Sequence, residues 1–293
     1  MIKLLLPSGK TISSIIVSTA FGVDGRGIFP HTLKPHYRNL LAAAKETGTT
    51  VITKSVTRHG RKGNFIPRNP FTWKYIRKLP SRGRTSCAML NAYGLTNPGV
   101  EEFINRLKKA DKSRLIPSIY PEFSKGEDLA NYEARVAAAM IYEQAGVSEI
   151  ELNFSCPNSK ELKKFYPKMY IIAKISIVHP YEFAQELERT GVDMIHSVNT
   201  VPFELVYPGK TSPLAKVGGG GVSGTPIFWQ AYDYNKGLRQ KVKVPIIMGG
   251  GVTNSDFAIK YIGIGADTVS ICTSALRKSR EAEKIIRLLN AEF

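Results

Sequence analysis

Cysteine is rare in this sequence, and long apolar runs are missing. The 293 residues include only Cys87, Cys156 and Cys272, which lie far apart with no CxxC pair and no histidine cluster nearby. This spacing argues against a disulfide framework, a zinc site and a cysteine-ligated iron–sulfur cluster, so no metal site is predicted. No segment approaches the ~18 consecutive apolar residues of a membrane span. Because Pro7 and Gly9 break the opening segment too early for a secretory signal, we expect a cytoplasmic protein without membrane association.

Acidic residues are scarce in the first third of the chain. Residues 1–100 contain sixteen Lys and Arg but only Asp24 and Glu46, so this third carries +14 of the net charge of +17. Between Arg58 and Arg84 there is no acidic residue, and basic residues are interspersed with four aromatic ones. Such a mixture is found in nucleic-acid-binding proteins. It is also found on solvated basic faces and on surfaces that dock acidic partners, which is the interpretation we favour.

Short apolar, β-branched segments alternate with helical stretches, as in a parallel sheet with crossover helices. We find no repeat, low-complexity tract or linker, and therefore expect one domain over residues 1–293. The predicted fold is an α/β (β/α)8 TIM barrel with an N-terminal β-hairpin and a long basic excursion after an early strand. Since a barrel takes eight of nine candidate strands, we expect 50–54 or 86–91 to lie partly outside it. The nine are 15–20, 50–54, 86–91, 115–120, 149–154, 169–175, 194–199, 244–250 and 268–273.

Helices are predicted between these strands. Pro35 is expected to open the first, and Gly48 to close it in a left-handed conformation. Asp128 is expected to cap a second helix that runs to Gly146. Further helices are predicted near 180–190, 254–263 and 278–291.

Polar residues concentrate where the predicted strands end, and these ends face the active site of a (β/α)8 barrel. Lys174 interrupts the apolar strand YIIAKIS, where a lysine must either snorkel to solvent or meet an anion. The segments MGGG (248–251) and CTS (272–274) end the last two strands. Their backbone N–H and hydroxyl groups would suit a phosphate.

Four asparagines also gather at these strand ends. An amide offers both a donor and an acceptor, which suits a planar ring with alternating C=O and N–H groups, such as a pyrimidine. Asparagine is common in loops for turn formation as well, so each residue alone is weak evidence. The four are Asn91, Asn153, Asn158 and Asn199.

In their order along the chain, these motifs resemble the dihydroorotate dehydrogenase family. The resemblance implies an FMN-binding barrel that oxidises dihydroorotate to orotate in de novo pyrimidine biosynthesis. It also implies the soluble class (class 1), because Cys156 stands where the membrane-associated class has serine and because the membrane-binding extension of that class is missing. The matching pieces are TKSVT…RKGNFIPR, NAYGLTNPG, ELNFSCPN, AKIS, SVNT, GGVSG, IIMGGGV and ICTSAL.

The resemblance also implies roles for single residues. Cys156 would be the general base, with Lys54 as a second catalytic residue, and hydride would pass to the flavin N5. Since a free thiol is mostly protonated at neutral pH, Lys54 and Lys174 would favour the thiolate, and activity should rise with pH. The substrate would be held by Lys54, Asn91, Asn153, Asn158, Asn199 and Thr200. FMN would be lined by Ala20, Gly22, Lys54, Ser55, Asn153, Lys174, Gly221, Gly250, Gly251, Cys272 and Thr273.

The chain departs from the family pattern in three places. The interval from Asn158 to Lys174 is too short for the full helix that the family has there, which puts the lid over the substrate in question. Phe21 stands where a small or hydroxyl residue is common, and Pro121 follows SIY where glycine is usual. Neither is therefore assigned a side-chain contact with FMN. We further expect a homodimer, and an electron acceptor that is either fumarate-like or a partner subunit docked on the basic surface.

Other functions fit parts of the pattern. Uracil reduction is one, although that family has histidine at the position of Asn158. Synthesis of dihydrouridine in tRNA would suit the basic excursion, but those enzymes resemble NxGCPxxK and usually add a helical RNA-binding domain. A non-redox nucleic-acid-binding barrel would have no need of Lys54, Cys156 and Lys174. We favour orotate chemistry and expect no nucleic-acid partner.

Overall fold

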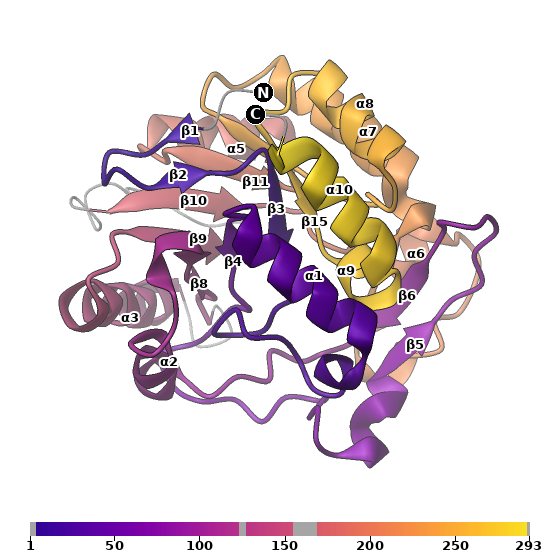
Figure 1. Cartoon of the computed structure of the whole chain (residues 1–293), viewed down its shortest axis with the longest axis horizontal. Coiled ribbons are helices and arrows are strands. Elements are labelled where there is room, and N and C mark those ends of the chain that lie inside the picture. The colour runs from indigo at the N-terminus through magenta and orange to yellow at the C-terminus, as the bar shows by residue number, and fades with distance from the viewer. Residues whose placement is uncertain (1–3, 123–126, 155–168, 292–293) are drawn as a thin grey trace.

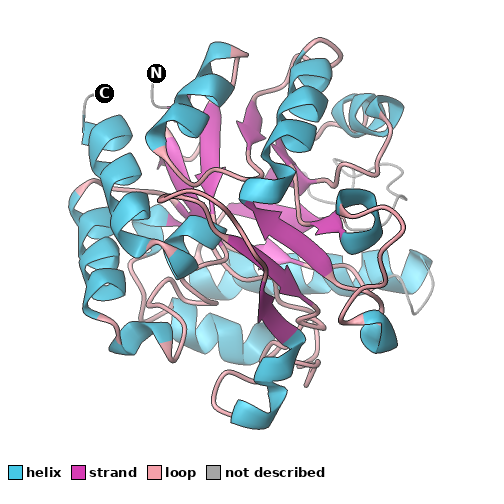
Figure 2. Cartoon of the chain, turned by 90° about the vertical axis from the view of Figure 1, so that its right-hand side faces the viewer, coloured by secondary structure: helices cyan, strands magenta, loops and turns pink. Residues whose placement is uncertain are grey.

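Eight parallel strands form a barrel in the computed structural model, which describes residues 4–122, 127–154 and 169–291. Helices surround the strands (Figures 1 and 2). Each strand is hydrogen-bonded to its neighbours in chain order, as expected for a TIM barrel, and the predicted fold is confirmed. The barrel strands are β3 (Ile15–Ser18), β4 (Val51–Ile52), β7 with β8 (Leu115–Ile116 and Ser118–Ile119), β9 (Glu149–Asn153), β10 (Tyr170–Lys174), β11 (Met194–Ser197), β14 (Ile246–Met248) and β15 (Thr268–Ile271).

The barrel closes at the strand formed by β7 and β8. β7 pairs with β4, whereas β8 pairs with β9 on the other side. Pro117 separates the two short pieces because proline has no N–H to donate to the ladder. One interrupted strand therefore joins both edges of the sheet.

The outer helices follow the sequence pattern closely. α1 (Pro35–Glu46) opens with proline and is followed by Gly48, whose φ of +63° is left-handed. α3 (Glu127–Ala145) already includes Asp128, so the prediction that this residue caps the helix is wrong. In the described ranges, no helix is both long and apolar enough to cross a lipid bilayer. The others are α2 (Val100–Leu107), α5 (Tyr181–Arg189), α6 (Phe203–Val206), α7 (Phe228–Arg239), α8 (Ser255–Gly263), α9 (Thr273–Arg277) and α10 (Ser279–Ala291).

The segment 86–91 lies outside the barrel, as one of two alternatives predicted. Its strand β6 (Ala88–Asn91) joins an antiparallel sheet of four strands in the order β12-β13-β6-β5. The basic excursion supplies β5 (Ile76–Lys78) to this small sheet, directly after the 3-10 helix η2 (Pro70–Tyr75), while β12 (Val201–Pro202) and β13 (Gly221–Gly224) come from later in the chain. β5 and β6 project on the lower right of Figure 1.

An N-terminal hairpin of β1 (Leu4–Leu5) and β2 (Thr11–Ile12) lies at the other side of the same view (Figure 1), and this prediction is confirmed. Ile12 belongs to an apolar cluster inside the barrel. Lys10, from the hairpin loop, forms an ion pair of 2.6 Å with the buried carboxylate of Glu149 and donates to the carbonyl oxygen of Leu115. The hairpin is therefore tied to the barrel by both packing and charge.

The barrel interior changes from apolar to polar along the strands. Its apolar layer contains Ile16, Ile52, Ile116, Ile172, Met194 and Ile247. Side chains two positions apart on a strand point to the same face. The next inward positions are Ser18, Lys54, Ser118, Lys174, His196 and Gly249. The same alternation that fills the core thus puts polar groups at the carboxyl ends of the strands.

Candidate active site

A cavity of about 370 Å³ opens between the carboxyl ends of the barrel strands and the small sheet. Its volume lies in the range typical of small-molecule sites. Most of the predicted site residues are brought together in its lining, although they come from all parts of the chain. They are Lys54, Ser55, Asn91, Asn153, Lys174, Asn199, Thr200, Gly250, Gly251, Cys272 and Thr273.

Three predicted FMN residues are not in this lining. The carbonyl oxygen of Ala20 accepts a hydrogen bond from a buried tyrosine hydroxyl, and that of Gly22 accepts one from the Lys54 backbone N–H. Gly221 pairs with Asn91 in the small sheet, and its strand contributes Ser223 and Gly224 to the cavity in its place.

Cys156 and Asn158 lie outside the residues that the structure describes, and so does most of the shortened segment 159–170. The catalytic base and the lid therefore stay predictions.

The amide side chains in the cavity are linked to one another. Asn153 donates through Nδ2 to the Ser55 hydroxyl at 3.0 Å, and Asn199 donates to the Asn153 Oδ1 at 3.4 Å. The Asn199 Oδ1 accepts from the backbone N–H of Thr200 at 2.9 Å. These bonds fix the orientation of both amides, so that donors and acceptors are held at one wall of the cavity.

Lys54 is a cation with few partners. Its ammonium donates to the carbonyl oxygen of Thr96 and lies 3.7 Å from the ring centroid of Tyr93. In the described part of the chain no carboxylate pairs with it, and burial lowers the pKa of Lys54 to about 7. A desolvated ammonium with only a carbonyl and an aromatic face beside it favours an anionic ligand. Tyr93 was missed in the sequence because only the folded chain brings it over Lys54.

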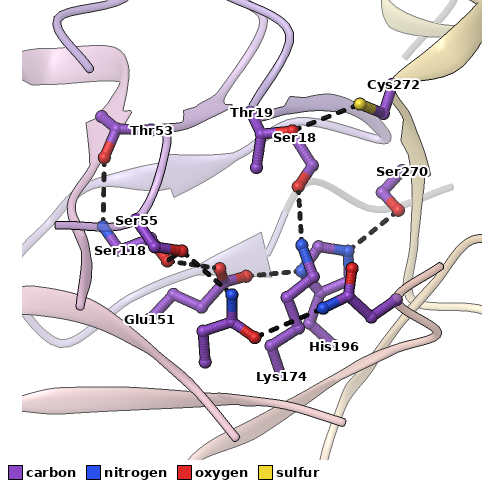
Figure 3. A network of polar contacts seen from close by, with 12 residues as sticks. Ser18, Thr19, Thr53, Ser55, Ser118, Glu151, Lys174, His196, Ser270 and Cys272 are labelled. Atoms are coloured by element: carbon purple, nitrogen blue, oxygen red, sulfur yellow. Dashed lines mark hydrogen bonds and ion pairs between the residues drawn. The ribbon is translucent and has the colours of Figure 1, made fainter. Parts of the chain in front are cut away.

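Lys174 occupies the centre of the barrel mouth. In the parallel ladder it pairs with Asn153 on one side and with His196 on the other. Only 5% of the residue is exposed, and its ammonium donates to the Ser18 hydroxyl at 3.2 Å (Figure 3). Lys174 thus lies at the cavity, and its contact with a ligand stays a prediction.

A second set of buried polar residues, which the sequence reading missed, lies beside Lys174. Figure 3 shows a chain of contacts from Ser118 through Glu151 to His196 and Ser270. The Glu151 carboxylate accepts from the Ser118 hydroxyl at 2.7 Å and meets the His196 Nδ1 at 2.5 Å. His196 Nε2 lies 2.9 Å from the Ser270 hydroxyl. Period-two alternation could have found His196, because it lies two residues after the inward-facing Met194.

The surrounding charges determine the protonation states of Glu151 and His196. Burial would raise the pKa of Glu151, but the Lys174 charge, His196 and the Ser118 hydrogen bond together lower it. Burial and then the Lys174 charge lower the pKa of His196, and these effects outweigh Glu151. A carboxylate and a neutral imidazole follow, so His196 donates from Nδ1 to Glu151 and accepts at Nε2 from Ser270.

The glycine loop after β14 offers bare backbone donors to the cavity. Gly250 and Gly251 have φ of +98° and +78°. A Cβ at Gly251 would lie 2.6 Å from the Cα of Phe228, so only glycine fits there. Within the described ranges, the N–H groups of Gly250 and Gly251 donate no hydrogen bond. Two free donors beside Thr273 suit a phosphate.

Cys272, also in the lining, is a partly buried thiol that contacts the Thr19 hydroxyl at 3.2 Å. Burial raises the pKa of Cys272, which keeps it protonated at neutral pH. It therefore contributes a contact surface rather than a nucleophile.

Comparison with known proteins decides the family. A family model described as dihydroorotate dehydrogenase matches residues 36–178 and 167–293. The chain belongs to the dihydroorotate dehydrogenase family. This confirms the predicted family, the predicted class of flavin oxidoreductase and the reaction that goes with it, the oxidation of dihydroorotate to orotate in pyrimidine biosynthesis.

Two bacterial relatives of this chain carry the name dihydroorotate dehydrogenase B (NAD(+)), catalytic subunit. The protein of Oceanobacillus iheyensis is 31% identical over 247 residues, which cover 76% of this chain and 74% of the relative. That of Parabacteroides distasonis is 27% identical over 304 residues, covering 94% and 88%. Ligand-free DHODH from Eimeria tenella superposes with a TM-score of 0.68 at 18% identity, over 99% of this chain and 88% of that one, and supports the fold.

Proposed function

We propose that the cavity binds FMN and dihydroorotate together, and that Cys156 acts as the general base in oxidising dihydroorotate to orotate. The observation that carries the proposal is that two lysine ammonium groups, those of the half-buried Lys54 and the buried Lys174, lie at a cavity lined by amides. Ammonium groups withdrawn from water are costly unless an anion meets them. Dihydroorotate brings a carboxylate, and FMN brings a phosphate and a ring that gains negative charge on reduction.

The residues present fit FMN. The free N–H groups of Gly250 and Gly251, with Thr273, would hold the phosphate. Lys174 would lie against the ring, and Ser55 and Asn153 would hydrogen-bond to its polar edge. Bound FMN supplies the acceptor for the hydride that leaves the substrate.

The remaining side chains would orient the substrate and move its proton. Lys54 would bind the carboxylate of dihydroorotate, while Asn91 and Asn199 would hydrogen-bond to the ring amides. Cys156, as thiolate, would take one proton from the carbon next to the ring carbonyl. The neighbouring carbon loses hydride, so the ring gains a double bond and the proton remains on the thiol.

Anaerobic bleaching of the flavin tests this proposal. We expect purified protein to be yellow and to lose its absorbance near ~450 nm with dihydroorotate but not with dihydrouracil, which lacks the carboxylate for Lys54. Cys156→Ala should retain FMN and slow bleaching by ~100-fold or more. Colourless protein that cannot be reconstituted with FMN would contradict the cofactor. Equal bleaching by both substrates would contradict the role of Lys54, and rapid bleaching of Cys156→Ala would contradict the base.

We infer further that electrons leave through a partner subunit, since the relatives named above are catalytic subunits of NAD(+)-linked enzymes. The basic surface formed by η2 and β5 would dock this partner. It borders the cavity, because Ile76 of β5 lies in the lining. Turnover with fumarate alone at the full rate would remove the reason for a partner. The predicted homodimer is testable by sedimentation.

A further inference from the structure

The arrangement of Glu151 and Lys174 is unexpected for two buried opposite charges. Glu151 is fully buried and Lys174 nearly so. The two lie on paired strands, where Glu151 is opposite Ile172, two positions before Lys174 and on the same face, and Figure 3 shows the two side chains close together. A direct ion pair would be the usual outcome for such groups. Among the described residues, however, no ion pair joins them, and Lys174 donates to Ser18.

The carboxylate oxygens of Glu151 are held by other donors. Oε1 accepts from Ser118 and Oε2 from His196, the latter at 2.5 Å. His196 cannot turn freely, because its other nitrogen bonds to Ser270 on the far side of the ring. Its position in the ladder beside Lys174 places the imidazole at the cavity floor. The donors that satisfy Glu151 thus leave the lysine ammonium for the cavity.

We propose that His196 is a positioning residue for Lys174: by holding the Glu151 carboxylate, it keeps the lysine ammonium directed at the ligand in the cavity. The proposal rests on the proposed flavin site and adds to it a residue that acts on the Lys174 ammonium through Glu151. Without the histidine donor, the free Oε2 would draw the ammonium into a direct pair with Glu151. The cavity would then lose the positive charge that stabilises reduced FMN.

The test uses the FMN-loaded enzyme and measures the flavin midpoint potential together with the Kd for FMN. His196→Leu removes the donor at similar volume. We expect the preference for reduced over oxidised flavin to fall about tenfold, which corresponds to about 30 mV for a two-electron couple. The matched control is His196→Asn, whose amide N–H can replace Nδ1–H. Its potential should stay near that of the wild type.

A double-mutant cycle separates positioning from simple structural support. In a Glu151→Gln background there is no carboxylate to capture the ammonium, so His196→Leu should leave the potential unchanged. An equal fall of the potential in that background would overturn the proposal. So would a wild-type potential in folded His196→Leu, or an equal fall in Leu and Asn variants. If the leucine variant does not fold, His196→Thr, which is too short to reach Glu151, takes its place with the same expected outcomes.

The wild-type measurement distinguishes failure of this proposal from failure of the proposed function. Wild-type protein that binds no FMN would contradict the flavin site itself. Wild-type protein that binds FMN, with variants of unchanged potential, would contradict only the role of His196.

Discussion

At the scale of single residues, the burial of Lys54 predicts how ligand affinity depends on pH. Its pKa, lowered by burial to about 7, means that the ammonium is present below pH 7 and lost above it. A bound orotate carboxylate favours the charged form, so the Kd for orotate should rise by about tenfold per pH unit above 7. Spectral titration of the flavin with orotate between pH 6 and 9 measures this. Lys54→Met should bind orotate weakly, with a Kd that does not change with pH over this range. A wild-type Kd that stays constant between pH 6 and 9 would contradict the role of Lys54.

Two glycines of different surroundings give a second prediction at this scale. In Gly251→Ala the new Cβ would meet the Phe228 backbone at a φ of +78°, and we expect a loss of roughly 1–3 kcal/mol in stability together with weaker FMN binding. Gly263→Ala is the control, since it lies in α8 with nothing within 4 Å of its Cβ. It should raise stability by about 0.5–1 kcal/mol. Urea unfolding of both variants checks the opposite signs.

Residues differ in how far the sequence alone could predict them. Lys174 is predictable because a lysine interrupts an otherwise apolar strand. His196 interrupts its strand in the same way, but its role depends on Glu151, which lies 45 positions earlier and meets it only through the pairing of β9, β10 and β11. Tyr93 likewise reaches Lys54 through the fold. The sequence alone can indicate a single unusual residue. A pair of interacting side chains can be predicted only when the register of the strands that bring them together is known.

At the scale of elements, the alternation of strand-like and helical segments predicts the barrel, but it does not predict which of the nine candidate strands lies outside it. The segments 50–54 and 86–91 are both short and apolar, and no local property distinguishes them. β6 lies outside the barrel because it pairs with β5 and β13, which run antiparallel to it, and not with the parallel barrel strands. Only two residues of the other segment, Val51 and Ile52, are in strand conformation. Partner choice, rather than propensity, decided between them.

The hairpin gives a prediction at the scale of elements. Lys10→Met leaves the buried Glu149 carboxylate without its cation, which should cost about 3 kcal/mol in the free energy of unfolding at pH 7. Burial tends to raise the pKa of Glu149, but the hydrogen bonds and charge of Lys10 and nearby hydroxyls hold it below its usual value. This stabilisation is present above the unfolded pKa and is lost as pH falls through the folded one.

The difference between Lys10→Met and wild type should therefore shrink at pH 4 and below. Lys284→Met is the matched control, because Lys284 pairs with Glu281 on the exposed face of α10. The free energy of unfolding of Lys284→Met should fall by less than about 1 kcal/mol at either pH. Equal losses in the two variants at pH 7 would mean that the hairpin contact contributes no more than a surface pair.

At the scale of the whole molecule, the uneven charge predicts where a partner binds. Some of the excess is already balanced within the chain, since Arg58 pairs with Glu101 and Arg61 with Glu122. Arg77 and Lys78 are exposed on β5 instead, directly after the cavity-lining Ile76. An acidic partner docked there would approach the flavin site closely, and its association would be steered by charge.

Reversing these charges should therefore weaken partner binding without changing flavin reduction. For Arg77→Glu with Lys78→Glu we expect an association rate at least ~10-fold lower at low salt, with the difference shrinking as salt screens the charges. Anaerobic bleaching by dihydroorotate should keep its wild-type rate, because neither side chain is part of the proposed site. Lys236→Glu with Lys241→Glu, on and just after α7, changes the net charge equally and controls for it. An equal loss in both double variants would mean that net charge alone, and not the surface at β5, governs the encounter.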